Sequence, residues 1–342
     1  MHHAAPLEFK FRFVNKQGQP EGLLRTKGSF DGERLHLGKG VSCPAVAILQ
    51  SETRNDRLIL ALASDKPEPG IVVLAATKGV VNDLKARLDV SRSRFWADAS
   101  RKALQAEGRG HAHRERECPN CSAVLLLTDM PETPQLYCVY CKALTTADGP
   151  EQRVETSHML CDECGLFSAP RKFTIFYFYF LLVVYGYHQR ITWRCPGCMR
   201  GEAWKMFFGN LLFVLGVPVA IAQLIRAYGS SRVGRYTGLD KANLLARKGD
   251  ALAALDVYNE ISSRVTPCAG IKYNAGMALV EAQDLEQAAE FFEFSLDDCA
   301  NYAPAYRALI QCYANTGQHE KRLALQRTWG DTSEEQPERR AG

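Results

Sequence analysis

Between residues 7 and 78, hydrophobic positions recur in short runs that are separated by polar turns such as Asp31-Gly32 and Asn55-Asp56. These runs are LEFKFRFV (7–14), RLHLG (34–38), AVAILQ (45–50), RLILALA (57–63) and IVVLAAT (71–77). Several short apolar or alternating runs at this spacing predict a small β-barrel or sandwich.

The period changes after Val80, where apolar residues recur at helical spacing among many charges. They are Val81, Leu84, Leu88, Phe95, Trp96 and Leu104. This spacing predicts an amphipathic helix that extends to about Ala106.

Over residues 6–106, the order of strands followed by one helix resembles the pleckstrin-homology fold. Within this region, the segment GSFDGERLHLGKGVSCPAVAIL (28–49) resembles the PH-like and GRAM-like domains. The resemblance implies a seven-stranded barrel with a C-terminal helix, and binding of a lipid headgroup or a peptide. A generic β-domain without a ligand of its own is the alternative. The polar stretch EGRGHAHRERE (107–117) is then expected to be a linker.

Twelve cysteines change the picture, because eight of them form four CxxC pairs. The pairs are Cys118/Cys121, Cys138/Cys141, Cys161/Cys164 and Cys195/Cys198. The other four, expected to be small core residues, are Cys43, Cys268, Cys299 and Cys312. The N-terminal MHHAAPLEFKFRF has no apolar signal region, so we expect a cytoplasmic chain with reduced thiols that bind metal.

Each CxxC turn aims two sulfurs at one point, and two such turns complete a tetrahedral zinc site. Taken in sequence order, the pairs predict two structural Zn²⁺ sites, in a first ribbon over 118–158 and a second over 159–203. The CDECG and CPGC pieces resemble zinc-ribbon knuckles. In the first ribbon, AVLLLTD (123–129) and QLYCVY (135–140) are expected to form a hairpin. In the second, the apolar stretch after Cys164 predicts two long strands.

Other interpretations of the cysteines remain open. Rubredoxin-type iron also uses such knuckles, a cross-braced pairing resembles FYVE and RING domains, and CxxC pairs serve as dithiols in redox proteins. Closed all-cysteine sites leave no position for a substrate. His158 and His188 are expected to be surface or core residues, and no phosphate-binding, zinc-protease or serine-hydrolase motif occurs. We therefore expect a protein that is not an enzyme.

Two apolar stretches, Phe173–Tyr187 and 206–226, are candidates for membrane contact. The first, with 15 residues, is short for a span and is expected to be a buried or interfacial hairpin. The second is long enough to span, but Gly216-Val217-Pro218 interrupts it. The whole chain carries a net charge of +4, whereas residues 165–235 hold nine Lys/Arg and one acid. This predicts a membrane-associated segment over 204–228 and contact with an anionic membrane through 165–235.

Residues 235–330 contain three units with a period of 34, which start at Arg235, Ala269 and Ala303. The first two units have small residues at the eighth and twentieth positions and a turn at the fifteenth, which resembles the tetratricopeptide repeat. The third unit departs from this pattern at Arg322 and Gln326, as a polar capping unit would. The resemblance implies paired helices whose concave face binds a protein or peptide partner. A structural stack, or one that binds segments of this same chain, is the alternative. Residues 331–342 are expected to form a flexible tail.

Together these features predict a multidomain α+β protein: a small β-barrel with a helix, zinc-ribbon hairpins, an apolar helical segment and an all-α repeat. We expect a zinc-binding scaffold that recruits partners at a membrane surface. The first alternative is a soluble nucleic-acid-associated factor, which the net charge of −5 over residues 118–164 disfavours. The second is a CxxC dithiol redox protein.

Overall fold

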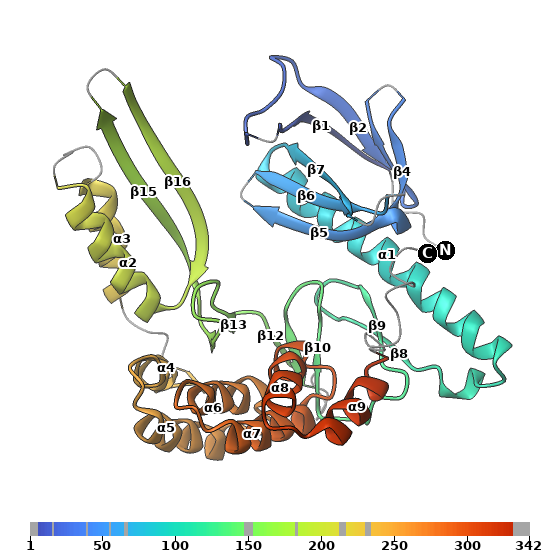
Figure 1. The fold of residues 1–342 in the computed structure, drawn as a ribbon. Coiled ribbons are helices and arrows are strands. Elements are labelled where there is room, and N and C mark those ends of the chain that lie inside the picture. The colour runs from blue at the N-terminus through green and yellow to red at the C-terminus, as the bar shows by residue number, and fades with distance from the viewer. Residues whose placement is uncertain are drawn as a thin grey trace. The chain divides into compact units, whose positions relative to one another are not determined.

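The structure, a computed structural model, describes residues 6–15, 17–38, 40–54, 56–64, 68–146, 153–181, 184–211, 217–229 and 234–330, and of 178–189 only the backbone. The predicted flexible tail, 331–342, lies outside the described residues. The chain divides into two compact units between Asp129 and Met130. Figure 1 labels the elements of both units.

The first unit contains a seven-stranded antiparallel sheet of order β4-β3-β2-β1-β7-β6-β5. Its strands are β1 (Leu7–Phe13), β2 (Thr26–Phe30), β3 (Arg34–Leu37), β4 (Ser42–Pro44), β5 (Ile48–Arg54), β6 (Arg57–Leu62) and β7 (Gly70–Ala75), with the 3₁₀ turn η1 (Ala45–Ala47) before β5. The sequence pattern missed β2 and β4, because TKGSF and SCP have no apolar run.

The helix α1 (Lys78–Ala106) packs its first turns on the core of this sheet. Val81, Leu84 and Leu88 are buried there, as the helical spacing predicted. Phe95 and Trp96, expected on the same buried face, are instead about half exposed. A helix of 29 residues is about 44 Å long, whereas strands of five to seven residues span about 20 Å. The helix therefore extends beyond the sheet, so the sheet does not cover Phe95 and Trp96.

Short strands flank the cysteine pairs in an arrangement that differs from the predicted hairpin. In the first unit, β8 (Glu115–Glu117) pairs with β9 (Val124–Leu126), and the 3₁₀ turn η2 (Gly110–Ala112) precedes them. In the second unit, β10 (Gln135–Tyr137), β11 (Leu144–Thr146) and β12 (Arg153–Glu155) form an antiparallel sheet. The arms predicted at 123–129 and 135–140 thus do not pair with each other. The expected linker, 107–117, supplies one strand.

A long hairpin follows the third cysteine pair, as the apolar run predicted. After the small pair β13 (Met159–Leu160) and β14 (Phe167–Ser168), strands β15 (Arg171–Leu181) and β16 (Val184–Arg194) pair along eleven residues each. Helices α2 (Pro196–Gly209) and α3 (Val217–Tyr228) pack together and against β15 (Figure 1).

The segment 206–226 is not one continuous helix. Asn210 ends α2 and donates its side-chain amide to the carbonyl of Phe176, 3.0 Å away. The chain resumes as α3, with Pro218 in its first turn, where the missing N–H breaks no helical hydrogen bond. None of the helices in the described parts of the chain combines the length and apolarity needed to cross a membrane.

Six helices build the C-terminal stack of the second unit. They are α4 (Leu239–Arg247), α5 (Ala251–Arg264), α6 (Ala269–Glu281), α7 (Leu285–Asp298), α8 (Ala303–Asn315) and α9 (His319–Thr328). The turn position of the predicted repeat carries Gly249, Gln283 and Gly317, all with positive φ. At the predicted small position, a Cβ on Gly276 would meet the Phe292 ring at 2.6 Å, which explains why this position is a glycine.

Candidate metal centres

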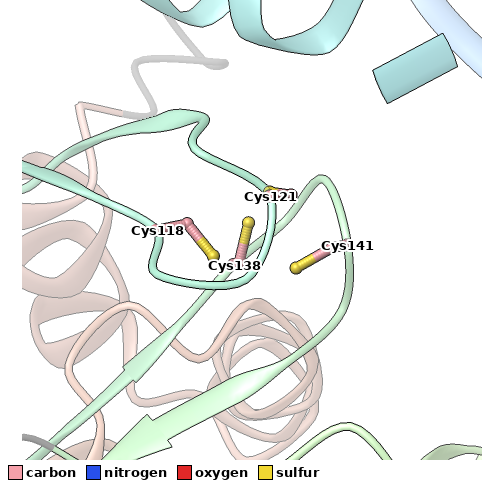
Figure 2. Close-up of side chains that lie close together, drawn as sticks. All are labelled: Cys118, Cys121, Cys138 and Cys141. Carbon is pink, nitrogen blue, oxygen red and sulfur yellow. The ribbon is translucent and has the colours of Figure 1, made fainter. Parts of the chain in front are cut away.

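The eight cysteines of the CxxC pairs form two groups of four, and the pairs combine in sequence order. The first group is Cys118, Cys121, Cys138 and Cys141, and the second is Cys161, Cys164, Cys195 and Cys198. Within each group the sulfurs all lie within 4.8 Å of one another. Figure 2 shows the side chains of the first group converging on a common space. The cross-braced alternative, with first and third pairs together, is therefore excluded.

Three of the four knuckles use the same backbone turn. The Cys138 carbonyl accepts a hydrogen bond from the N–H of Lys142, and the Cys138 N–H donates to the carbonyl of Ala143. Cys118 and Cys161 repeat this pattern with the residues that follow them. The residue after the second cysteine has positive φ in each turn, at Ser122, Lys142 and Gly165. This left-handed residue reverses the chain so that both sulfurs face the same side.

The fourth knuckle is the N-terminus of a helix instead. Cys195 is the N-cap of α2, Pro196 is in its first turn, and the Cys198 N–H points to the Cys195 sulfur at 3.5 Å. Proline is common at this position because its fixed φ suits the first helical turn. The partial positive charge of a helix N-terminus favours a thiolate over a thiol.

Backbone hydrogen bonds bring the two halves of the second group together. The N–H of Asp162 donates to the carbonyl of Trp193 at 2.9 Å, and the N–H of Trp193 donates to the Asp162 carboxylate at 2.7 Å. The Cys195 N–H then donates to the Cys161 sulfur at 3.3 Å. A knuckle and a helix start that lie 34 residues apart are thus joined by the chain itself.

The second group fits a tetrahedral metal ion. A zinc ion with four Zn–S bonds of about 2.3 Å holds its sulfurs about 3.8 Å apart. The Cys164 and Cys195 sulfurs are 3.9 Å apart. The neighbouring sulfurs of Cys164, Cys195 and Cys198 hold the pKa of Cys161 below its ordinary value. Four sulfur donors complete the coordination and leave no position for water or substrate.

Charged side chains surround the second group. Arg194, which is almost fully buried, pairs with Glu163 at 2.7 Å and with Glu202 at 3.5 Å. Its guanidinium also lies 5.7 Å from the centre of the Phe173 ring. These contacts connect β16 to the third knuckle and to α2, which carry the four sulfurs.

Asparagines of the helical stack hold the strands next to the cysteine pairs, a role that the sequence pattern did not reveal. The Asn274 side chain accepts from the N–H of Phe167 and donates to its carbonyl, both at 2.7 Å. Asn243 donates to the same carbonyl at 3.0 Å. Asn301 accepts from the Tyr137 N–H at 2.9 Å and donates to its carbonyl at 2.8 Å. All three asparagines are buried.

A signal for these residues existed in the sequence. Asparagine disfavours helix interiors, because its side chain competes for backbone hydrogen bonds. Asn243 and Asn274 nevertheless stand on otherwise apolar faces of predicted helices. A buried polar residue in such a place needs a partner. The sequence could not identify that partner, because the strand that carries it lies more than 70 residues away.

His158 and the four remaining cysteines lie outside both groups. His158 bonds to Glu155 at 3.1 Å, stacks on the Phe167 ring and lies tilted against the Tyr236 ring, whereas the side chain of His188 lies outside the described residues. Burial raises the pKa of the other four thiols, Cys43, Cys268, Cys299 and Cys312. These thiols therefore behave as uncharged residues; the last three are buried in the helical stack, and Cys43 packs half-buried against the sheet core.

Compared with models of known protein families the chain matches none, and it has no match among curated proteins. Its function is therefore inferred from the geometry of its own residues.

Proposed function

We propose that this chain is a non-enzymatic zinc-binding scaffold that lies on an anionic membrane surface and recruits a protein partner through its helical stack. The two cysteine groups support zinc as the resident metal, since thiolate-only tetrahedral sites favour it. Their closed coordination supports a structural role. Metal analysis of the purified full chain, with an absorption spectrum to detect iron–thiolate bands, distinguishes zinc from iron.

The observation that carries the membrane proposal is an exposed apolar face on α2 and α3. It consists of six exposed residues on α2, on the turn after α2 and on α3, and we call it the α2/α3 face: Trp204, Phe208, Leu211, Ile221, Ile225 and Tyr228. Phe208 is 64% exposed and Ile225 69% exposed. Large apolar side chains gathered on one surface mark interaction sites in soluble domains.

The chemistry at the edge of this face favours a lipid headgroup region. The Trp204 indole N–H donates to the Tyr228 hydroxyl at 3.2 Å, and such amphipathic rings suit the membrane interface. Lys205 and Arg226 are exposed next to the apolar stripe on each helix. Basic residues beside a shallow apolar face are typical of segments that lie in the plane of an anionic membrane.

The α2/α3 face is tied directly to the second metal centre. Helix α2 begins at Cys195, and both helices pack on β15 through a shared core that includes Phe173, Met199 and Ala220. A metal ion bound to the four sulfurs would therefore fix the start of α2, and with it the position of the α2/α3 face. The inner helices of the stack, α6 and α8, supply the surface for a protein partner.

Vesicle flotation of the zinc-loaded full chain tests the membrane proposal. We expect flotation with vesicles of phosphatidylcholine and phosphatidylserine, little with phosphatidylcholine alone, and weaker flotation as salt screens the basic residues. The double variant Phe208→Ser/Ile225→Ser should lose flotation.

The matched control is Phe294→Ser/Leu252→Ser, because these two side chains are also exposed but lie on the helical stack. This control should float like the unmodified chain. Equal flotation of both double variants, or none of the unmodified chain, contradicts the proposal.

A further inference from the structure

The inner face of the helical stack already binds extended chain. Asn274 pairs with both backbone polar groups of Phe167, and Asn301 pairs with both of Tyr137. The Phe167 ring packs directly on the backbone of α6, where a Cβ on Gly270 would meet it at 2.5 Å. This face therefore recognises extended segments by amide-to-backbone pairs and by a ring seated between helices.

A cavity of about 650 Å³ adjoins both of these bound segments. Tyr137 and Phe167 both line it, together with the inner helices α6 and α8. Its volume lies in the range of sites that hold a drug-sized ligand or a few residues of peptide. Its apolar lining includes Leu144, Met159, Leu160, Met277, Val280 and Leu285.

Helix α8 presents a polar row along the same cavity. Arg307, Gln311 and Asn315 are spaced by four residues, line the cavity and are exposed. Residues four apart lie on one face of a helix. The row thus offers two side-chain amides, the group by which the stack holds Phe167 and Tyr137, beside one guanidinium.

The charges of the cavity favour an acidic occupant. Lys142 comes from the turn after Cys141, and Arg307 comes from α8. Asp162 is the one acidic residue among those that line the cavity in the described chain, and its carboxylate accepts the Trp193 N–H. Arg307 and Lys142 against Asp162 give the described lining one more positive than negative charge, which favours a negatively charged group in the cavity.

The C-terminal tail of this chain does not have the matching chemistry. Residues 331–342 read DTSEEQPERRAG, in which the only apolar residues are Pro and Ala. Such a segment supplies no large side chain to fill an apolar cavity of this size. Residues 331–342 are therefore disfavoured as the occupant of this cavity.

We propose that this cavity binds an extended segment of a partner protein in which a large apolar residue stands next to Asp or Glu. The apolar side chain enters between α6 and α8, the carboxylate meets Arg307 and Lys142, and the α8 amides bind the backbone. This proposal rests on the recruiting role proposed above and gives it a place and a partner chemistry.

Selection from random heptapeptides displayed on phage, panned on the zinc-loaded full chain without vesicles, tests this. We expect enriched sequences to carry an apolar residue beside an acid, and end-blocked synthetic copies to bind in fluorescence anisotropy. Arg307→Glu should weaken their binding about tenfold or more, which corresponds to about 1.4 kcal/mol. Met277→Trp, which fills the cavity, should weaken it further.

Arg327→Glu is the matched control, because it reverses an exposed arginine on α9 outside the cavity. Because Arg307 is exposed, we expect the Arg307→Glu variant to fold. The test therefore remains decisive even if Met277→Trp misfolds. No enrichment, basic consensus sequences, or equal loss in both arginine variants overturns the proposal. Vesicle flotation uses residues outside the cavity, so the membrane proposal stands or fails separately.

Discussion

The two cysteine groups differ in how the chain presents their sulfurs. The first group uses two loop knuckles, and both require a non-glycine residue, Ser122 or Lys142, in the left-handed region. The second uses one loop knuckle with Gly165 and the start of α2. Three sulfurs of the second group are buried, against two of the first. The second centre is thus preorganised by secondary structure, whereas the first depends more on its metal to hold its turns.

The largest effect is expected from removing one ligand of each group in turn. Cys198→Ser and Cys121→Ser should each reduce bound zinc from two ions to one, because three thiolates no longer close a tetrahedral site. Structural zinc contributes folding free energy outright, so each loss should cost several kcal/mol. Cys121→Ser should cost more, because the first group depends more on its metal to hold its turns, whereas α2 and the backbone pairing at Trp193 support the second. Metal content and thermal unfolding measure both effects.

The control for this pair is Cys43→Ser, a half-buried thiol outside both groups. It should retain two zinc ions. A full zinc content in either ligand variant would show that the metal is bound elsewhere.

A second comparison concerns the two strands held by the helical stack. Asn274 is fully buried and makes three hydrogen bonds, two to Phe167 and one to Asn243 at 3.0 Å. Asn301 makes two to Tyr137, accepts a third, weaker one from the Cys299 thiol at 3.3 Å, and is slightly more exposed. Alanine at either position leaves buried backbone groups unpaired, so we expect losses of about 3 kcal/mol for Asn274→Ala and about 2 kcal/mol for Asn301→Ala.

Urea unfolding of the zinc-loaded chain measures these losses. Asn315→Ala, an exposed position on α8, should change the unfolding free energy by less than about 0.5 kcal/mol. A larger loss for Asn301→Ala than for Asn274→Ala would reverse the comparison and place the stronger anchor beside the first group.

The contrast between these residues also explains what the sequence could reveal. The grouping of the eight cysteines into two sets of four was predictable, because a CxxC knuckle is a local turn whose spacing brings two sulfurs together. The asparagine anchors were not, because Asn274 and Phe167 lie 107 residues apart. The strand partner of residues 124–126 was also mistaken, because charged ERE (115–117) has no strand pattern of its own and forms β8 only through pairing.

The apolar segments show the same limit. Hydropathy located 206–226 but could not decide between a span and a pair of packed helices. That choice depends on long-range contacts such as Asn210 with the Phe176 carbonyl. In α1, likewise, helical spacing predicted the helix but not the point where the sheet stops covering it.

A pH-dependent effect is expected beside the second centre. Burial alone would raise the pKa of Glu155, but hydrogen bonds from His158 and Ser157 outweigh it and lower the pKa from 4.5 to about 2. A carboxylate with a lowered pKa stabilises the fold above its unfolded value, and this contribution disappears as the pH falls toward about 2. Glu155→Gln should therefore cost about 2 kcal/mol at pH 7.

The difference between the unmodified chain and Glu155→Gln should shrink as the pH falls from about 4.5 to about 2. Measuring both proteins at each pH cancels the common loss of metal in acid. A difference that stays constant over this range would show that the glutamate acts by shape instead of charge.

The smallest effects test the knuckle turns themselves. Gly165 has φ +69°, and a Cβ added there would meet no heavy atom within 4 Å, so Gly165→Ala adds conformational strain without a clash. Left-handed backbone costs a non-glycine residue about 1 kcal/mol. Ser122 already bears that cost at φ 59°, so Ser122→Gly should stabilise the first group by up to about 1 kcal/mol, while Gly165→Ala destabilises the second by a similar amount. Thermal unfolding with zinc bound measures both. If the unfolding temperatures of the two variants shift in the same direction, the two turns do not share one geometry. The contrast between loop knuckles and a helix start would then lose its basis.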